Sequence, residues 1–218
     1  MVSALLIIVN IAVFLYELLL GPEAGEAFIR SFALIPKRLF PQMTDVHGTV
    51  QIGATLVTSM FLHGGILHIA GNMLYLWIFG NNVEDSMGRI RFIFFYLLCG
   101  IFAAYSHALA NVSSTVPMIG ASGAISGILG AYLMLYPRAR VLTLVAFGLY
   151  VRTVEIPAMF VLGFWFVLQS LNAVISAGTG AGVAWYAHIG GFLAGIALIG
   201  LFKRSDVPFW GRKRDDNL

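Results

Sequence analysis

Residues 117–130 read Pro117-Met118-Ile119-Gly120-Ala121-Ser122-Gly123-Ala124-Ile125-Ser126-Gly127-Ile128-Leu129-Gly130. This stretch is apolar enough to span a bilayer, yet it is built mostly from glycines, alanines and two serines. Small side chains let neighbouring helices approach closely in lipid, so we expect the rest of the chain to be organised around it. Ser122 has no bulky neighbour, and its hydroxyl is either a packing group or a nucleophile.

The composition indicates an integral membrane protein. Of the 218 residues, 59% are hydrophobic and only 11% are charged, and the mean hydropathy is +0.88. A soluble domain carries roughly 25% charged residues. We expect one membrane domain over residues 1–218, with residues 203–218 as a basic cytoplasmic tail. The single cysteine, Cys99, excludes an internal disulfide.

Six segments have the length of a helical span, about 20 mostly apolar residues. They are residues 2–20, 56–80, 92–110, 119–136, 156–176 and 183–202. We therefore predict an all-α, six-helix bundle whose first segment is a retained span. Residues 21–55 form a long mixed connection that is expected at the membrane surface, and residues 81–91 a polar turn. The apolar run 141–151 is too short to span and is predicted to be re-entrant or interfacial.

Basic residues divide unevenly between the two sides of this bundle. Only Arg30, Lys37 and Arg38 fall on one side, and the other ten basic residues fall on the opposite side. The positive-inside rule places that second side in the cytoplasm, together with both termini. The second, fourth and sixth spans consequently enter from the outer face.

Polar residues converge just inside the outer ends of these three spans. The second span carries His63, His68 and Asn72, the fourth Ser122 and the sixth His188. Polar groups in a membrane are costly and suggest function by default. A histidine that contacts a serine hydroxyl is the minimum for an activated nucleophile, and His68 with Asn72 can donate hydrogen bonds to an oxyanion.

Two glycine pairs would allow the fourth and sixth spans to pack closely, namely Gly123 with Gly127 and Gly191 with Gly195. None of the ten acidic residues falls at outer depth in the second, fourth or sixth span. Glu17, near the outer end of the first span, is the only intramembrane candidate for a third catalytic member. We expect a Ser–His dyad, with Glu17 holding the loop by hydrogen bonds.

Three motifs on the appropriate spans resemble those of the rhomboid family of intramembrane serine proteases, and the resemblance covers nearly the whole chain. The motifs are Gly120-Ala121-Ser122-Gly123, His63-Gly64-Gly65-Ile66-Leu67-His68-Ile69-Ala70-Gly71-Asn72-Met73 and Ala187-His188-Ile189-Gly190-Gly191. A lone GxSG motif would be weak evidence, whereas all three in this order are specific.

The resemblance implies Ser122 as nucleophile and His188 as general base. It implies an oxyanion hole from His68, Asn72 and the Ser122 backbone N–H. It further implies lateral substrate entry near the fifth span and a mobile cap at residues 178–182. Four residues are expected to support the site: His63, Gly120, Gly123 and Gly191.

This chain departs from the pattern of some family members at two places. Ala54-Thr55 stands where some members have Trp-Arg, and Ser126 stands where some have an aromatic residue that stacks on the histidine. The sequence does not identify what supports the His188 ring.

The predicted function is therefore cleavage of transmembrane-helix substrates by a Ser–His dyad. We expect no metal, no cofactor and no nucleic-acid partner, and a multi-pass location in a bacterial inner membrane. The alternative is a non-proteolytic rhomboid-like protein that binds membrane-protein clients. Three other interpretations compete with this one: Ser122 as a helix-packing serine, the histidines as metal or haem ligands, and a small-solute channel.

Overall fold

The computed structural model describes residues 1–40, 52–147, 150–176 and 183–211. Within these ranges, four helices have the length and apolar composition of a membrane span: α1 (Val2–Leu19), α7 (Arg89–Ala110), α9 (Ala158–Ile175) and α10 (Trp185–Phe202). A fifth candidate is a bent pair, in which Thr55–Phe61 meets Ile66–Met87 at 98°. The chain is thus a mostly helical membrane protein.

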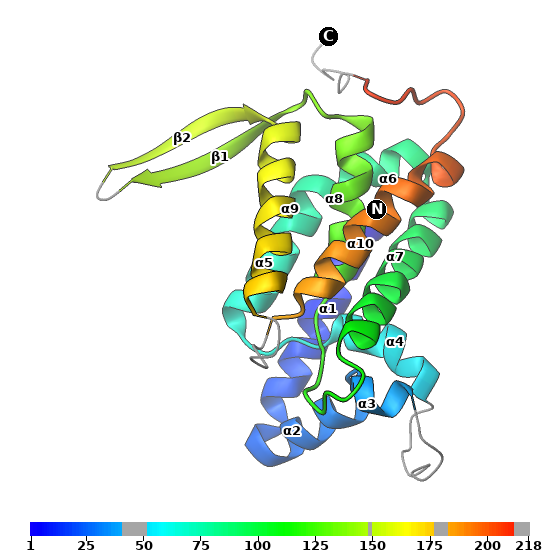
Figure 1. Cartoon of the computed structure of the whole chain (residues 1–218), viewed down its shortest axis with the longest axis vertical. Coiled ribbons are helices and arrows are strands. Elements are labelled where there is room, and N and C mark those ends of the chain that lie inside the picture. Colours follow the sequence, from blue (N-terminus) through cyan, green and yellow to red (C-terminus); the bar gives the residue numbers. More distant parts are fainter. Residues whose placement is uncertain (41–51, 148–149, 177–182, 212–218) are drawn as a thin grey trace.

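Helix α8 (Ser122–Leu135) is apolar but contains only 14 residues. At 1.5 Å per residue it is about 21 Å long, which is shorter than the hydrocarbon core of a bilayer. The helix begins at Ser122 and not at the predicted residue 119, since residues 117–121 are not helical. Figure 1 shows α8 beside α9 and α10 in the bundle.

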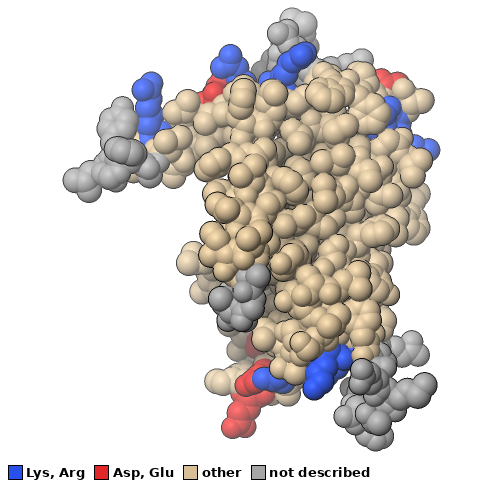
Figure 2. Space-filling view, in the orientation of Figure 1, with Lys and Arg blue, Asp and Glu red and all other residues tan. Residues whose placement is uncertain are grey.

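Charged side chains lie at the two ends of the molecule. In Figure 2 the Lys, Arg, Asp and Glu side chains of this face gather at the top and bottom, and an uncharged belt separates them. Large apolar side chains of α1 and α9 are exposed on the outer surface of the bundle, among them Leu5, Ile8, Phe160 and Phe164. This distribution is that of a protein surrounded by lipid.

Glycines bring the backbones of α8 and α10 into contact. A Cβ atom added to Gly191 would overlap the carbonyl oxygen of Gly123, and one added to Gly195 would overlap that of Gly127. A Cβ on Gly130 would likewise overlap the carbonyl oxygen of Phe192. The close approach expected from the two glycine pairs is therefore present.

The predicted second span, residues 56–80, is broken. A short helix α4 (Thr55–Thr58) and a 3₁₀ turn η2 (Ser59–Phe61) come first. After residues 62–65 the helix continues through α5 (Ile66–Tyr75), a π-helical turn η3 (Leu76–Gly80) and α6 (Asn81–Met87). The turn predicted at residues 81–91 is consequently wrong, since the chain turns only at Gly88, whose φ is +84°.

Glu84 explains why a polar segment remains helical at this end. Its carboxylate accepts hydrogen bonds from the backbone N–H groups of Val2 and Ser3, both at 2.8 Å, and from the Ser3 hydroxyl at 2.7 Å. These N–H groups begin α1 and have no intrahelical acceptor. Glu84 thus caps the first helix. This contact ties α6 to α1, so the polar residues around Glu84 belong to a helix and not to a loop.

The described parts of the connection, residues 21–40 and 52–55, are largely helical and not a loop without regular structure. They contain α2 (Gly21–Phe32), α3 (Pro36–Leu39) and the 3₁₀ turn η1 (Ile52–Ala54). Leu34 pairs with Met118 through two backbone hydrogen bonds of 3.2 and 2.7 Å. This bridge fixes the segment that leads into α8.

The apolar run predicted to be re-entrant or interfacial forms strands over its described residues, 141–147 and 150–151. Strands β1 (Arg140–Phe147) and β2 (Tyr150–Pro157) form an antiparallel hairpin that projects sideways from the bundle (Figure 1). The run is rich in β-branched residues, which favour strands. The all-α prediction is corrected accordingly, and the fifth helix begins at Ala158, after Pro157 rather than at residue 156.

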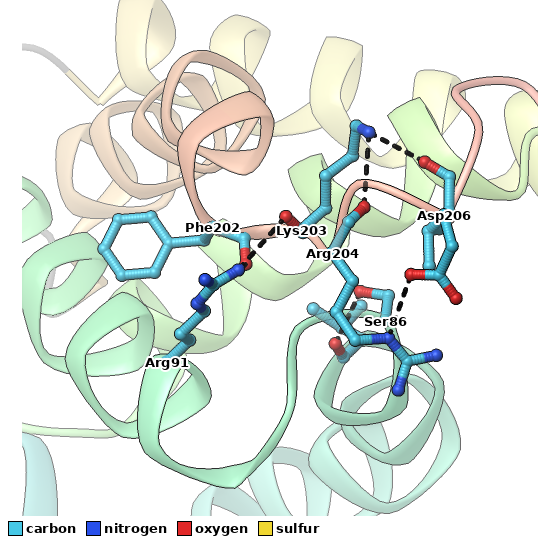
Figure 3. Close-up of polar contacts among 8 residues, drawn as sticks. Ser86, Arg91, Phe202, Lys203, Arg204 and Asp206 are labelled. Atoms are coloured by element: carbon cyan, nitrogen blue, oxygen red, sulfur yellow. Dashed lines mark hydrogen bonds and ion pairs between the residues drawn. The ribbon is translucent and has the colours of Figure 1, made fainter.

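Polar contacts fix the end of α10 (Figure 3). The Arg91 guanidinium donates to the carbonyl oxygens of Phe202 and Lys203 at 3.5 and 3.4 Å. The Arg204 N–H donates to the Ser86 carbonyl at 2.9 Å. The start of α1 and the end of α10 therefore both meet α6. Residues 212–218 of the predicted tail lie outside the described residues.

We predict that Gly195→Ala destabilises the bundle. A methyl group there overlaps Gly127, whereas one on Gly163 of α9 would meet no atom within 4 Å. Overpacking of this kind costs about 1–3 kcal/mol, so the midpoint of thermal unfolding in detergent should fall. Gly163→Ala is the matched control, for which we expect no fall, because alanine favours helix over glycine. Equal midpoints for the two variants would contradict the glycine contact.

Candidate active site

Ser122 occupies the first position of α8 because of the backbone before it. Gly120 has a φ of +119°, in a region that side chains disfavour, and its N–H donates to the Ser59 carbonyl at 2.9 Å. A Cβ on Gly120 would lie 2.7 Å from His68 Nε2. Glycine is therefore required both for the turn and for the space beside His68.

Ser122 and His188 form a hydrogen bond. His188 Nε2 lies 2.9 Å from Ser122 Oγ. Both residues belong to the first turn of their helices, α8 and α10. The backbones of these helices come into contact just beyond that turn, at Gly123 and Gly191. A serine in contact with an imidazole nitrogen is the arrangement that activates a hydroxyl for nucleophilic attack.

The second ring nitrogen of His188 has a partner that the sequence reasoning missed. Its Nδ1 lies 2.7 Å from Oε1 of Gln169 on α9, and Gln169 is buried. The rings of Trp165 and Trp185 lie 6.0 and 6.1 Å from the imidazole, centroid to centroid. An amide four residues after a tryptophan, and so on the same face of an apolar helix, is the signal that identifies Gln169 in retrospect.

The neighbours of His188 show which helix supports its ring. Trp165 on α9 is half-buried and packs against the imidazole. Ser126 donates its hydroxyl to the Ser122 carbonyl at 2.7 Å and remains within its own helix. Support for the His188 ring therefore comes from α9 and not from α8.

The histidines and the asparagine of the second span also lie together. Asn72 Nδ2 is 3.0 Å from Nε2 of the buried His63, and the His63 and His68 rings meet edge to face at 5.1 Å. The Gly64 N–H donates to His68 Nδ1 at 3.4 Å. Glu17 accepts a hydrogen bond of 3.4 Å from the His63 backbone N–H, at the break before α5.

One cavity of about 620 Å³ connects these groups. His68 and Asn72 line it from α5, and Ser122 and His188 line it from α8 and α10. His107 also lines it, from α7. This volume is in the range of small-ligand sites, and it admits a short peptide segment. The predicted cap at residues 178–182 lies outside the described residues.

Comparison with known proteins identifies relatives of the chain. The model of the Rhomboid domain family matches residues 51–205, which is more than half of the chain. Rhomboid protease GluP of Bacillus subtilis is 37% identical over 143 residues, which cover 66% of this chain and 25% of that protein. Rhomboid protein 1, mitochondrial, of Saccharomyces cerevisiae is 28% identical over 198 residues, which cover 86% of this chain and 49% of that protein.

A human relative, Presenilin-associated rhomboid-like protein, mitochondrial, is 29% identical over 146 residues, which cover 65% of this chain and 36% of that protein. The chain thus spans about half or less of the length of these relatives.

Proposed function

The chain belongs to the rhomboid family, and on this premise we propose that it is an intramembrane serine endopeptidase that cleaves transmembrane-helix substrates. The observation that carries the proposal is the 2.9 Å contact between Ser122 Oγ and His188 Nε2 at the wall of a cavity. The name of the Bacillus subtilis relative, a rhomboid protease, supports the same activity.

In the proposed mechanism, Ser122 Oγ attacks the carbonyl carbon of the scissile peptide while His188 Nε2 takes the hydroxyl proton. The tetrahedral intermediate collapses as His188 returns this proton to the leaving amine, and an acyl-enzyme remains. Water then attacks the ester, again with His188 as base, and releases the carboxylate product and the Ser122 hydroxyl.

Stabilisation of the oxyanion is assigned to His68, Asn72 and the Ser122 backbone N–H. His68 Nδ1 accepts the Gly64 N–H, so its proton resides on Nε2, which is free to donate. The Ser122 N–H lies in the first turn of α8, where N–H groups lack intrahelical acceptors. The positive end of the α8 dipole also favours a negative charge there.

Peptide substrates must unwind before they react, because an intact helix keeps its carbonyl groups in internal hydrogen bonds. The proposed partners are therefore transmembrane segments that carry helix-breaking or small residues. They would reach the cavity from the lipid beside α9. This helix lines the cavity with Trp165 and exposes apolar side chains such as Phe160 and Phe164 on its other side.

The proposed topology is a single domain with six spans, formed by α1, α5 to α6, α7, α8, α9 and α10, with both termini in the cytoplasm. In support, seven described basic residues lie after α6 at the end of the bundle opposite Ser122: Arg89, Arg91, Arg138, Arg140, Arg152, Lys203 and Arg204. Three lie on α2 and α3 at the other end. We propose a bacterial inner membrane as the location, in line with the Bacillus subtilis relative, and the positive-inside rule then orients both termini toward the cytoplasm.

We expect Ser122→Ala and His188→Ala each to reduce cleavage of a model transmembrane substrate by about a thousandfold or more, since each removes half of the dyad. Cleavage is measured in proteoliposomes. Ser126→Ala is the control, because within the described part of the chain the Ser126 hydroxyl donates to a carbonyl of its own helix, and this variant should cleave at close to the wild-type rate. Normal cleavage by Ser122→Ala would refute the proposal.

A fluorophosphonate probe separates this function from a non-proteolytic role in binding membrane-protein clients. The probe should label wild-type protein at Ser122 and leave Ser122→Ala unlabelled. A client-binding protein without protease activity would not be labelled in either form.

For the oxyanion assignment, we expect His68→Phe to lower kcat by about a hundredfold, because the ring is kept but the donor is lost. His107→Phe is the matched control, since His107 lines the same cavity and has no assigned role. Its kcat should stay within a few-fold of wild type. A loss of equal size in both variants would contradict the assignment of His68.

A further inference from the structure

The hydrogen bond from His188 to Gln169 determines which ring nitrogen of His188 carries the proton. Within the described residues, Gln169 Oε1 is the hydrogen-bond partner of His188 Nδ1, at 2.7 Å. An amide oxygen only accepts, so Nδ1 must carry the proton. The lone pair of Nε2 then faces Ser122 Oγ at 2.9 Å, which is the tautomer that a general base requires.

The opposite amide orientation would have the opposite effect. If the amide nitrogen faced Nδ1, the proton would reside on Nε2, and His188 would donate to Ser122 instead of accepting from it. Gln169 is 8% exposed, in a helix surrounded by apolar side chains. An amide at such a site is costly unless it is hydrogen-bonded, and the bond to His188 meets that cost.

We propose that Gln169 is a positioning residue that fixes the tautomer and the orientation of His188. The inference rests on the proposed function, in which His188 is the base. Trp165, one turn before Gln169 on α9, contacts the same ring and restricts its tilt. A neutral amide serves this role without placing a further charge in the membrane.

Two substitutions test the role of the acceptor. Gln169→Leu keeps the size but loses the acceptor, and we expect kcat for a model substrate to fall about tenfold to a thousandfold with little change in KM. Gln169→Glu keeps the acceptor and adds a charge. We expect it to stay active and to move the acid limb of the kcat/KM profile to higher pH, because a carboxylate stabilises the protonated imidazole.

The surroundings of His188 make this profile interpretable. The other titratable side chains on the cavity wall are His68, Tyr75 and His107, and no carboxylate lines it among the described residues. Ser170→Ala is the matched control on α9, because among the described residues the Ser170 hydroxyl donates to the Phe166 carbonyl of its own helix, at 3.0 Å. It should leave both kcat and the profile unchanged.

Rates are expressed per active site titrated with a fluorophosphonate, so that misfolded protein does not count. A wild-type kcat in Gln169→Leu, or an unshifted profile in Gln169→Glu, would overturn the positioning role. If Gln169→Leu does not fold, the Gln169→Glu profile decides alone. Failure of the proposed function is a separate result, namely normal cleavage by Ser122→Ala.

A second inference concerns the β1–β2 hairpin and does not depend on the activity. One of its faces carries Leu142, Leu144 and Val151, which are 69%, 67% and 60% exposed. Thr153 and Glu155 lie opposite Leu144 and Leu142 on this face, and the Glu155 carboxylate pairs with Arg140 at 3.5 Å where the hairpin joins the bundle. An isolated two-stranded hairpin is at best marginally stable in water, and the described part of the bundle leaves these three apolar side chains uncovered.

The position of the hairpin indicates what partner covers this face. Strand β2 ends at Pro157 and α9 begins at Ala158, so the hairpin leaves the bundle at the end of a candidate membrane span. Phe160, on the first turn of α9, is exposed and lies between the apolar face of the hairpin and the uncharged belt of the bundle. Figure 2 shows basic side chains along this end of the molecule, where they can reach lipid headgroups.

We propose that this face of the hairpin lies in the bilayer interface, with Leu142, Leu144 and Val151 against lipid acyl chains. The partner is thus lipid, and not a second protein. The surface is continuous with the lipid-exposed face of α9, and Arg140 and Arg152 of the two strands can extend to the headgroups.

Nitroxide labels test the location in nanodiscs. In a Cys99→Ala background, which removes the single cysteine, labels are attached at Leu142→Cys and Leu144→Cys. Phe164→Cys serves as the lipid-exposed control and Asp206→Cys as the water-exposed control. Collision with oxygen reports lipid contact, and collision with a water-soluble nickel chelate reports water contact.

We expect the labels at both hairpin positions to show the high oxygen and low nickel accessibility of the Phe164 control. Nickel accessibility equal to that at Asp206 would place the hairpin in water and overturn the proposal. Low accessibility to both reagents would indicate burial against another protein chain, and would overturn it as well.

Discussion

The backbone contact between α8 and α10 is the constraint on which the remaining structure depends. Gly123 and Gly127 face Gly191 and Gly195 with no room for a Cβ atom. In lipid there is no hydrophobic gain from burying one apolar helix against another, so close packing must provide the attraction. Because both helices begin at the same end, this contact also sets Ser122 and His188 at hydrogen-bond distance.

The length of the elements around this contact determines where the polar groups lie. Helix α8 is shorter than the hydrocarbon core, and the span that carries His68 and Asn72 is broken at residues 62–65. Both features place helix beginnings, with N–H groups that lack intrahelical acceptors, inside the bundle rather than at its end. The result is a cavity with polar walls inside an apolar protein. Hydrogen bonds among these polar groups offset the cost of burying them: Asn72 bonds to His63, and His188 bonds to Gln169 and Ser122.

The peripheral elements anchor this arrangement from both ends. Glu84 caps α1, Arg91 binds the last carbonyl groups of α10, and the Leu34–Met118 bridge holds the strand-like segment before Ser122. Helix α9 differs from the others in that much of its surface faces outward, yet it supplies Gln169 and Trp165 to the histidine. The proposed entry route of a substrate and the support of the base therefore belong to the same helix.

The sequence alone determined the membrane class, the approximate position of most helices, the family resemblance and the set of polar residues that meet, because hydropathy and small-residue motifs are local properties of the chain. It misjudged residues 81–87, where polar side chains suggested a turn, and it missed the hairpin at residues 141–151, which it predicted to be a re-entrant or interfacial segment. Tertiary partners decide both structures: the contact of Ser3 with Glu84 in one case, and the pairing of β1 with β2 in the other. Gln169 was missed for the same reason: an amide in an apolar helix has no meaning until the fold brings His188, 19 residues further along the chain, to within 2.7 Å.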